Sequence, residues 1–249
     1  MSDSGPRKRA AAMREEQARS ARRRRTVVTS SVVVAVLVVA VVIVVVATTG
    51  GGGGKTAATN SPPAPTTSAA LLTGQPGPEG IVLESGKPLA PAATPADGKT
   101  VDGIQCNASE QVAYHIHTHL AMYIDGTLRP LPGGIGIVDP QAQETPEGPF
   151  FGATRCYYWL HVHAQDGVIH IESPTQSTYT LGQFFAEWGQ PLSATQVGPA
   201  KGPVTAYVDG QPFNGNPADI RLASREDVQL DVGSPVVPFH RVDWSHSQL

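Results

Sequence analysis

Several residue types that mark common functional classes are scarce or missing in this chain of 249 residues. Met122 is the only methionine beyond the N-terminal tail, which argues against a methionine-rich carrier of Cu(I). No cysteine follows the long apolar segment directly, which excludes a lipoprotein. The chain also has no glycine-rich phosphate loop and no nucleophile elbow, so the sequence gives no sign of either chemistry.

Charge is distributed unevenly along the chain. Residues 1–26 carry nine basic and three acidic residues, and the rest carries nine basic and 18 acidic ones. The net charges of the two parts are therefore +6 and −9. Arg22–Arg25 border an apolar segment, so membrane topology and lipid headgroups explain the basic tail better than nucleic acid does. We expect a membrane partner and no nucleic-acid partner.

The segment Val27–Thr49 has 23 residues and no charge. A helix of this length spans about 35 Å, enough for a hydrocarbon core of about 30 Å. Because positive flanks stay inside, we expect a single-pass protein in the cell membrane, with its N-terminus cytoplasmic and its C-terminal domain extracytoplasmic. Two alternatives are a signal peptide cleaved near Val45-Val46-Ala47, for which the apolar run is long, and a buried core helix.

The remainder divides into a linker and one domain. Residues 50–100 are rich in Gly, Pro, Ala, Thr and Ser and lack apolar periodicity, which predicts a disordered, flexible linker. Residues 101–249 have the length of one ordinary domain.

The domain is predicted to be mainly β (α+β), with antiparallel hairpins and one short helix. Alternating patterns indicate strands at 111–124, 157–163, 168–172, 204–208, 219–222 and 227–232. Asp125-Gly126 and residues 164–167 are hairpin signals. Thr180 and Gln183 form a capping box at the start of a helix that Gly189 ends.

Histidines are concentrated in this domain at intervals of two residues. Because alternate residues of a strand share a face, His115, His117 and His119 are expected in one row, about 6.6 Å apart. His161 and His163 repeat the spacing. The segment 168–172 adds His170 and Glu172 on one side of a third strand.

Two neighbouring His-x-His strands could bring three or four imidazoles to one ion, because paired strands lie about 4.8 Å apart. Neutral imidazole suits Zn²⁺ and Cu²⁺. Without a metal, such a row builds a poor core face, because each ring carries a donor and an acceptor that need partners. The predicted zinc or copper ligands are His115, His117, His119, His161, His163 and His170.

Cys106 and Cys156 are the only cysteines. In an exported domain the default expectation is a disulfide, although two thiolate ligands are an alternative. Because Cys106 precedes His115 by nine residues and Cys156 precedes His161 by five, the bond would hold the two histidine strands side by side.

Four segments resemble an uncharacterised family of bacterial exported, often membrane-anchored, histidine-rich domains. They are His-Ile-His-Thr-His-Leu (115–120), Tyr-Trp-Leu-His-Val-His (158–163), Ile-His-Ile-Glu-Ser-Pro (169–174) and Tyr-Thr-Leu-Gly-Gln-Phe-Phe-Ala-Glu-Trp-Gly (179–189). The resemblance covers about residues 105–233 and implies no activity. The His-x-His pairs alone also resemble the zinc set of alpha-type carbonic anhydrases and the copper strand of copper-zinc superoxide dismutase.

Three functions remain open from the sequence. The leading hypothesis is a module that binds Zn²⁺ or Cu²⁺ outside the membrane. The second is a metal-dependent hydrolase or lyase, with Glu172 as general base through a metal-bound water. The third is an envelope interaction domain whose histidines are structural or sense pH.

Overall fold

The structure, a computed structural model, describes residues 69–247 and 249. The basic tail, the apolar segment at 27–49 and the first part of the predicted linker lie outside these residues. Among the described residues, no helix has the length and apolar character needed to cross a membrane.

Strands dominate the described residues, as the alternating patterns predict. In chain order they are β1 (Ala70–Leu71), β2 (Cys106–Asn107), β3 (Tyr114–Ile124), β4 (Thr127–Leu128), β5 (Ile137–Thr145), β6 (Gly148–Tyr158), β7 (Leu160–His161), β8 (Val168–Ser173), β9 (Leu192–Ser193), β10 (Gln196–Val197), β11 (Ala200–Lys201), β12 (Val204–Val208), β13 (Gln211–Phe213), β14 (Glu226–Val232) and β15 (His240–Arg241). Helix α2 covers Leu181–Trp188, and two short 3-10 helices cover Pro217–Asp219 and Trp244–His246.

A mixed seven-stranded sheet forms the centre of the domain. Its order is β13-β12-β14-β3-β8-β7, and β4 pairs with β3. The predicted hairpins β3–β4 and β7–β8 are antiparallel, and so is the pair β12–β13, whereas β14 runs parallel to β3 over seven paired positions. The expectation of antiparallel hairpins alone therefore misses the central pair. About a hundred residues separate β3 from β14, ample chain for the crossover that a parallel pair requires.

One prediction of local structure was wrong, one hairpin was not predicted, and one predicted strand is divided. Residues 219–222 form a 3-10 turn and an isolated bridge at Arg221 instead of a strand, after Pro217 and the Asn216 cap start the turn. The long hairpin β5–β6 was not predicted, because much of it is exposed and lacks apolar alternation. The predicted strand at 157–163 is interrupted at Trp159.

Helix α2 begins and ends where its capping residues place it. The Gln183 N–H donates to the Thr180 hydroxyl oxygen at 3.3 Å, and the Thr180 N–H donates to the Gln183 side-chain oxygen at 3.0 Å. Gly189 ends the helix with φ of 71°, which glycine adopts without steric cost. The helix buries Phe184, Phe185 and Trp188 against the central sheet.

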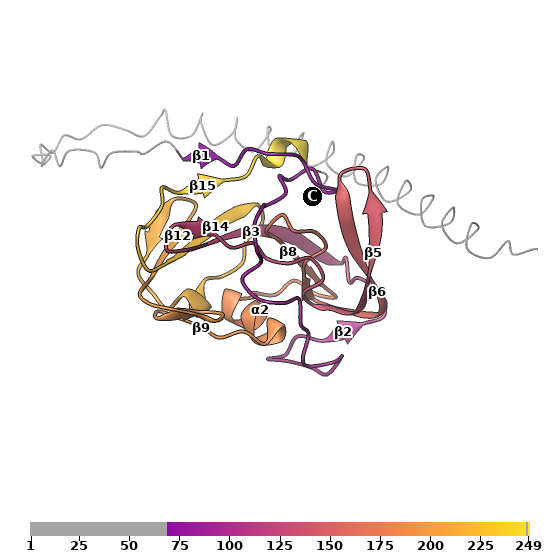
Figure 1. Cartoon of the computed structure of the whole chain (residues 1–249). Coiled ribbons are helices and arrows are strands. Elements are labelled where there is room, and N and C mark those ends of the chain that lie inside the picture. The colour runs from indigo at the N-terminus through magenta and orange to yellow at the C-terminus, as the bar shows by residue number, and fades with distance from the viewer. Residues whose placement is uncertain (1–68, 248) are drawn as a thin grey trace, which may run out of the picture. The chain divides into compact units, whose positions relative to one another are not determined.

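The two faces of the central sheet are both covered but differ in chemistry. In Figure 1, α2 lies on one side of the sheet, and β1, β15 and the C-terminal turn lie on the other. The α2 side is apolar and includes Ile116, Leu120 and Met122 of β3. We call the opposite side the histidine face. It carries His115, His117 and His119 of β3, His170 and Glu172 of β8, and Asp227 of β14.

Part of the predicted linker packs over the histidine face. Ile81 and Glu84 are buried, and the backbone N–H of Glu84 donates to the carbonyl of Gln165 at 2.8 Å. Ile81 joins Val168 and Val242 in a small apolar cluster. In the structure, the folded region therefore begins before the predicted boundary at residue 101. This segment is held by the buried side chains of Ile81 and Leu89 together with polar contacts to a strand face that the sequence does not reveal.

Candidate metal centre

Strand β8 brings the two His-x-His segments to one site by lying between them. Its residue His170 pairs with His117 of β3 on one side and with His161 of β7 on the other. Side chains at paired positions of a sheet project to the same face. The expectation that the two histidine strands are direct neighbours is therefore wrong, and His170 is the middle member of a row across three strands.

The first group of converging side chains centres on the start of β3. Donor atoms of His115, His117, His170 and Glu172 all lie within 4.8 Å of one another. The Nε2 atoms of His115 and His117 are 2.9 Å apart, and His115 Nε2 is also 2.9 Å from a carboxylate oxygen of Glu172. These side chains come from opposed positions of β3 and β8, so strand pairing itself positions them.

The second group consists of His161, His163 and His170, which also meet within 4.8 Å. His161 Nδ1 lies 2.8 Å from the carbonyl oxygen of Tyr158, and His163 Nδ1 lies 2.7 Å from that of Phe151. A carbonyl only accepts, so each Nδ1 carries a proton and, in the neutral ring, each Nε2 presents its lone pair.

The Nε2 atoms of His161 and His163 are nevertheless only 3.0 Å apart. Two lone pairs at this distance repel each other unless a cation or a shared proton lies between them. A backbone carbonyl that fixes one ring nitrogen is also the usual outer partner of a metal-bound histidine. The pair is therefore oriented for ligation rather than for a mutual hydrogen bond.

Burial keeps three of the histidines in the uncharged form that binds metals. Burial, followed by the charge of the neighbouring His170, lowers the pKa of His117 to about 2 and that of His163 to about 4. Burial, followed by His163, also lowers the pKa of His161 well below its usual value. All three rings are neutral at pH 7, and a metal ion need not displace a proton from the Nε2 atoms of His161 and His163.

His170 differs because carboxylates flank both of its ring nitrogens. Its Nε2 lies 2.8 Å from Glu79, and its Nδ1 lies 3.4 Å from Glu172. Burial lowers its pKa, but Glu79 and Glu172 outweigh burial and raise the pKa to about 10. Without a metal, His170 is thus the positive charge of the site.

Acidic side chains complete the centre, and two of them, Glu79 and Glu110, were not predicted from the sequence. Burial raises the pKa of Glu172, but hydrogen bonds from His115 and His170 reverse this and lower it. Glu79 and Glu172 each keep one buried oxygen without a hydrogen-bond partner among the described residues. Glu110 lies at the edge, 3.5 Å from His163 Nε2, and belongs to a third group with His161 and Glu172. Neither Glu79 nor Glu110 lies in a recognisable motif.

His119 lies in the same row as His115 and His117 but contacts different residues. Its Nε2 lies 3.2 Å from Glu84, and its Nδ1 lies 3.3 Å from Asp227. Burial lowers its pKa, but Asp227 and Glu84 outweigh burial and raise the pKa to about 9. In the described part of the chain, His119 belongs to none of the three groups. The structure therefore places it apart from the other predicted ligands, as a buried cation between two carboxylates.

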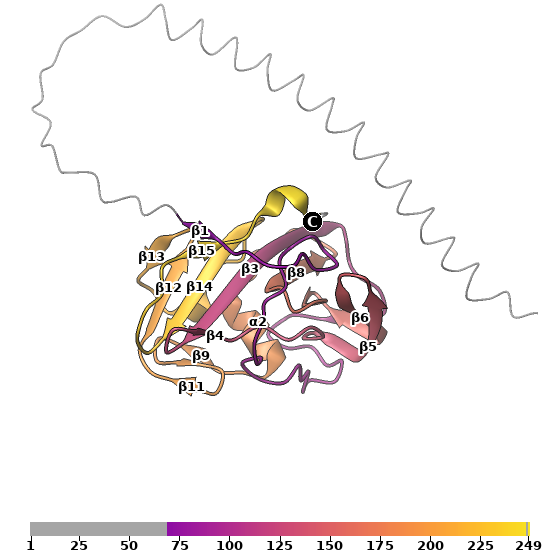
Figure 2. The same cartoon turned by 45° about the horizontal axis from the view of Figure 1, so that its top comes forward.

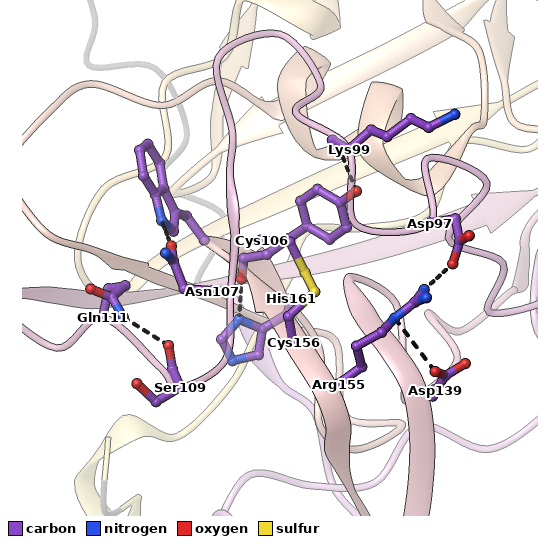
Figure 3. Close-up of a disulfide and its surroundings, with 12 residues drawn as sticks. Asp97, Lys99, Cys106, Asn107, Ser109, Gln111, Asp139, Arg155, Cys156 and His161 are labelled. Carbon is purple, nitrogen blue, oxygen red and sulfur yellow. Dashed lines mark hydrogen bonds and ion pairs between the residues drawn. A yellow bond between two sulfur atoms is a disulfide. The ribbon is translucent and has the colours of Figure 1, made fainter.

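The predicted disulfide between Cys106 and Cys156 is present. It joins β2 to β6 beside the centre, with His161 close to the bond (Figure 3). Arg155 contacts Asp97 and Asp139 on the same side. The bond links the strands that precede β3 and β7, and not the histidine strands themselves. It nevertheless holds the chain close to the point where β7 begins.

The hairpin β5–β6 closes one side of the centre. In Figure 2 it stands beside the central sheet at the β8 end. Phe150 of β6 stacks on His163 with ring centroids 4.4 Å apart and planes 10° from parallel. Together with the Phe151 carbonyl, this contact fixes the ring of His163 in position.

No protein-family model, no curated protein and no solved structure matches this chain.

Proposed function

We propose that this domain binds a divalent transition metal, zinc or copper(II), through the histidine centre. One observation carries the proposal: the Nε2 atoms of His161 and His163 face each other at 3.0 Å while both Nδ1 atoms are committed to backbone carbonyls. A metal ion resolves this contact, because imidazole nitrogens are good ligands for both metals. The ligands are His115, His117, His161, His163, His170 and Glu172.

Burial of the ligands favours capture or storage over hydrolysis. His161, His163 and Glu172 are almost inaccessible, and only His115 is partly exposed. A catalytic site keeps an open coordination position for water and substrate. Glu172 is also held within the ligand group by His115, which suits it to coordination better than to the role of general base.

We further propose that binding takes place outside the cell membrane, with the chain anchored by Val27–Thr49 and its N-terminus cytoplasmic. The charge pattern of the sequence supports this orientation. The disulfide is compatible with it, because disulfides persist in oxidising compartments. Protease added to intact cells should digest the C-terminal domain; protection of that domain would contradict the proposal.

Metal titration of the purified full-length chain tests the proposed function. We expect Zn²⁺ and Cu²⁺ to bind at about pH 7.5 and to raise the melting temperature, because a ligand of the folded state stabilises it. Binding should weaken as pH falls, because protons compete for imidazole. The double variant His117→Ala/His163→Ala should lose both effects.

The matched control is His240→Ala/His246→Ala, which removes two histidines outside all three groups and should change neither effect. The proposal would be contradicted if the wild-type chain bound no metal, or if the His117/His163 double variant bound metal as fully as the wild type. Either result would favour an interaction domain.

A further inference from the structure

The centre offers more donor atoms than one ion uses. Five imidazoles and two carboxylates, those of Glu110 and Glu172, belong to the three groups, and the carboxylate of Glu79 lies beside them. A zinc ion in a protein usually takes four ligands. We define the β3 set as His115 and His117 of β3 together with Glu172 of the neighbouring strand β8. We define the β7 set as His161 of β7 together with His163, which follows the end of that strand.

The histidines of the two sets do not converge on one ion, although Glu172 meets His161 and Glu110 in the third group. Among residues 69–247 and 249, no group of three donors within 4.8 Å combines histidines of both sets. Two nitrogens bound to one ion at about 2.1 Å each are at most about 4.2 Å apart. A single ion therefore cannot take a histidine from each set together with a third ligand, and β8, lying between β3 and β7, is the reason.

Among the described residues, His170 joins His115 and His117 in one group and His161 and His163 in another. Its Nδ1 faces Glu172, a member of the β3 set, at 3.4 Å. Its Nε2 lies 2.8 Å from Glu79, which belongs to neither set. The two nitrogens of the His170 ring therefore face two different carboxylates.

We propose that the centre holds two divalent transition-metal ions that share His170 as a ligand. One ion binds the β3 set and His170 Nδ1, and the other binds the β7 set and His170 Nε2. The ring protons of His170 pass to solvent when both ions bind. The unpartnered oxygens of Glu79 and Glu172 provide negative charge beside the two ions. This inference rests on the proposed function and adds the number of ions and the shared ligand.

Stoichiometry in two double variants tests the inference. In a titration with Cu²⁺, the full-length chain should bind about two equivalents, and both His115→Ala/His117→Ala and His161→Ala/His163→Ala should retain about one. The control His240→Ala/His246→Ala should retain both equivalents. If the wild type binds one equivalent and each double variant binds none, the two-ion inference is wrong and the proposed function still holds. No binding in the wild type would defeat the proposed function itself.

Electron paramagnetic resonance of the wild type tests the shared ligand without any substitution. Copper(II) ions bridged by one imidazole ring are magnetically coupled. The integrated signal should therefore rise up to the first equivalent and fall below the value for isolated ions as the second binds. A signal that grows in proportion to copper up to the second equivalent would overturn the sharing of His170.

Discussion

The two faces of the central sheet are both covered but are stabilised by different interactions. On the α2 side, apolar side chains fill the space, and burial alone favours their positions. On the histidine face, many of the buried groups can carry a charge, and each of these needs a particular partner. The apolar face therefore tolerates change as long as volume is kept, whereas the histidine face depends on the identity of each residue.

The largest effect on stability is expected on the apolar face. Trp188 of α2 is fully buried and donates its indole N–H to the Pro91 carbonyl at 2.8 Å. Trp188→Ala should lower the free energy of unfolding by about 3–5 kcal/mol, because it leaves a large cavity. Chemical denaturation measures this, with the exposed Val112→Ala as control. A loss no larger than that of the control would contradict the role of α2 in the core.

The histidine face should respond nearly as strongly where its charges are paired. His119→Ala leaves the buried carboxylates of Glu84 and Asp227 without their cation, which should cost about 3–5 kcal/mol. Metal stoichiometry should stay unchanged in the variant where it remains folded, because His119 lies outside the three groups. His246→Ala is the exposed control. Loss of one metal equivalent on replacing His119 would return this residue to the ligand set.

The disulfide should contribute an intermediate amount. The double variant Cys106→Ser/Cys156→Ser opens a loop with a sequence separation of 50 residues, and we expect a loss of about 2–4 kcal/mol. Chemical denaturation of the variant and of the oxidised wild type measures this loss of stability. Wild-type protein treated with a reductant should match the variant, and a variant as stable as the oxidised protein would show that the bond adds nothing.

The smallest effect concerns Glu187, a carboxyl buried in the apolar side with neither oxygen hydrogen-bonded among the described residues. Burial raises its pKa well above 4.5. Above this pH the unfolded chain is ionised while the folded protein keeps the proton, so stability falls as pH rises toward the folded pKa. The free energy of unfolding of Glu187→Gln should therefore exceed that of the wild type by on the order of 1 kcal/mol at about pH 7.5. Near pH 4 the two free energies should be equal. An equal difference at both values would contradict the explanation.

Local sequence patterns predicted the parts of the fold that depend on neighbouring residues. The alternation in β3 placed apolar residues on one face and histidines on the other, because the period of a strand is two. Thr180, Gln183 and Gly189 placed the two ends of α2, because caps satisfy backbone groups within one turn. The two lone cysteines predicted their own pairing.

Tertiary structure decided which histidines meet. His117 and His119 are two residues apart on the same face, but β8 lies beside His117 with His170 while β14 lies beside His119 with Asp227. One histidine thus joins the metal centre and the other joins a buried ion pair. The order of strands in a sheet depends on contacts between distant segments, and Glu79 and Glu84 arrive from a part of the chain that resembles a linker. The sequence alone therefore determined the types of donor present, and the packing of distant segments determined their grouping.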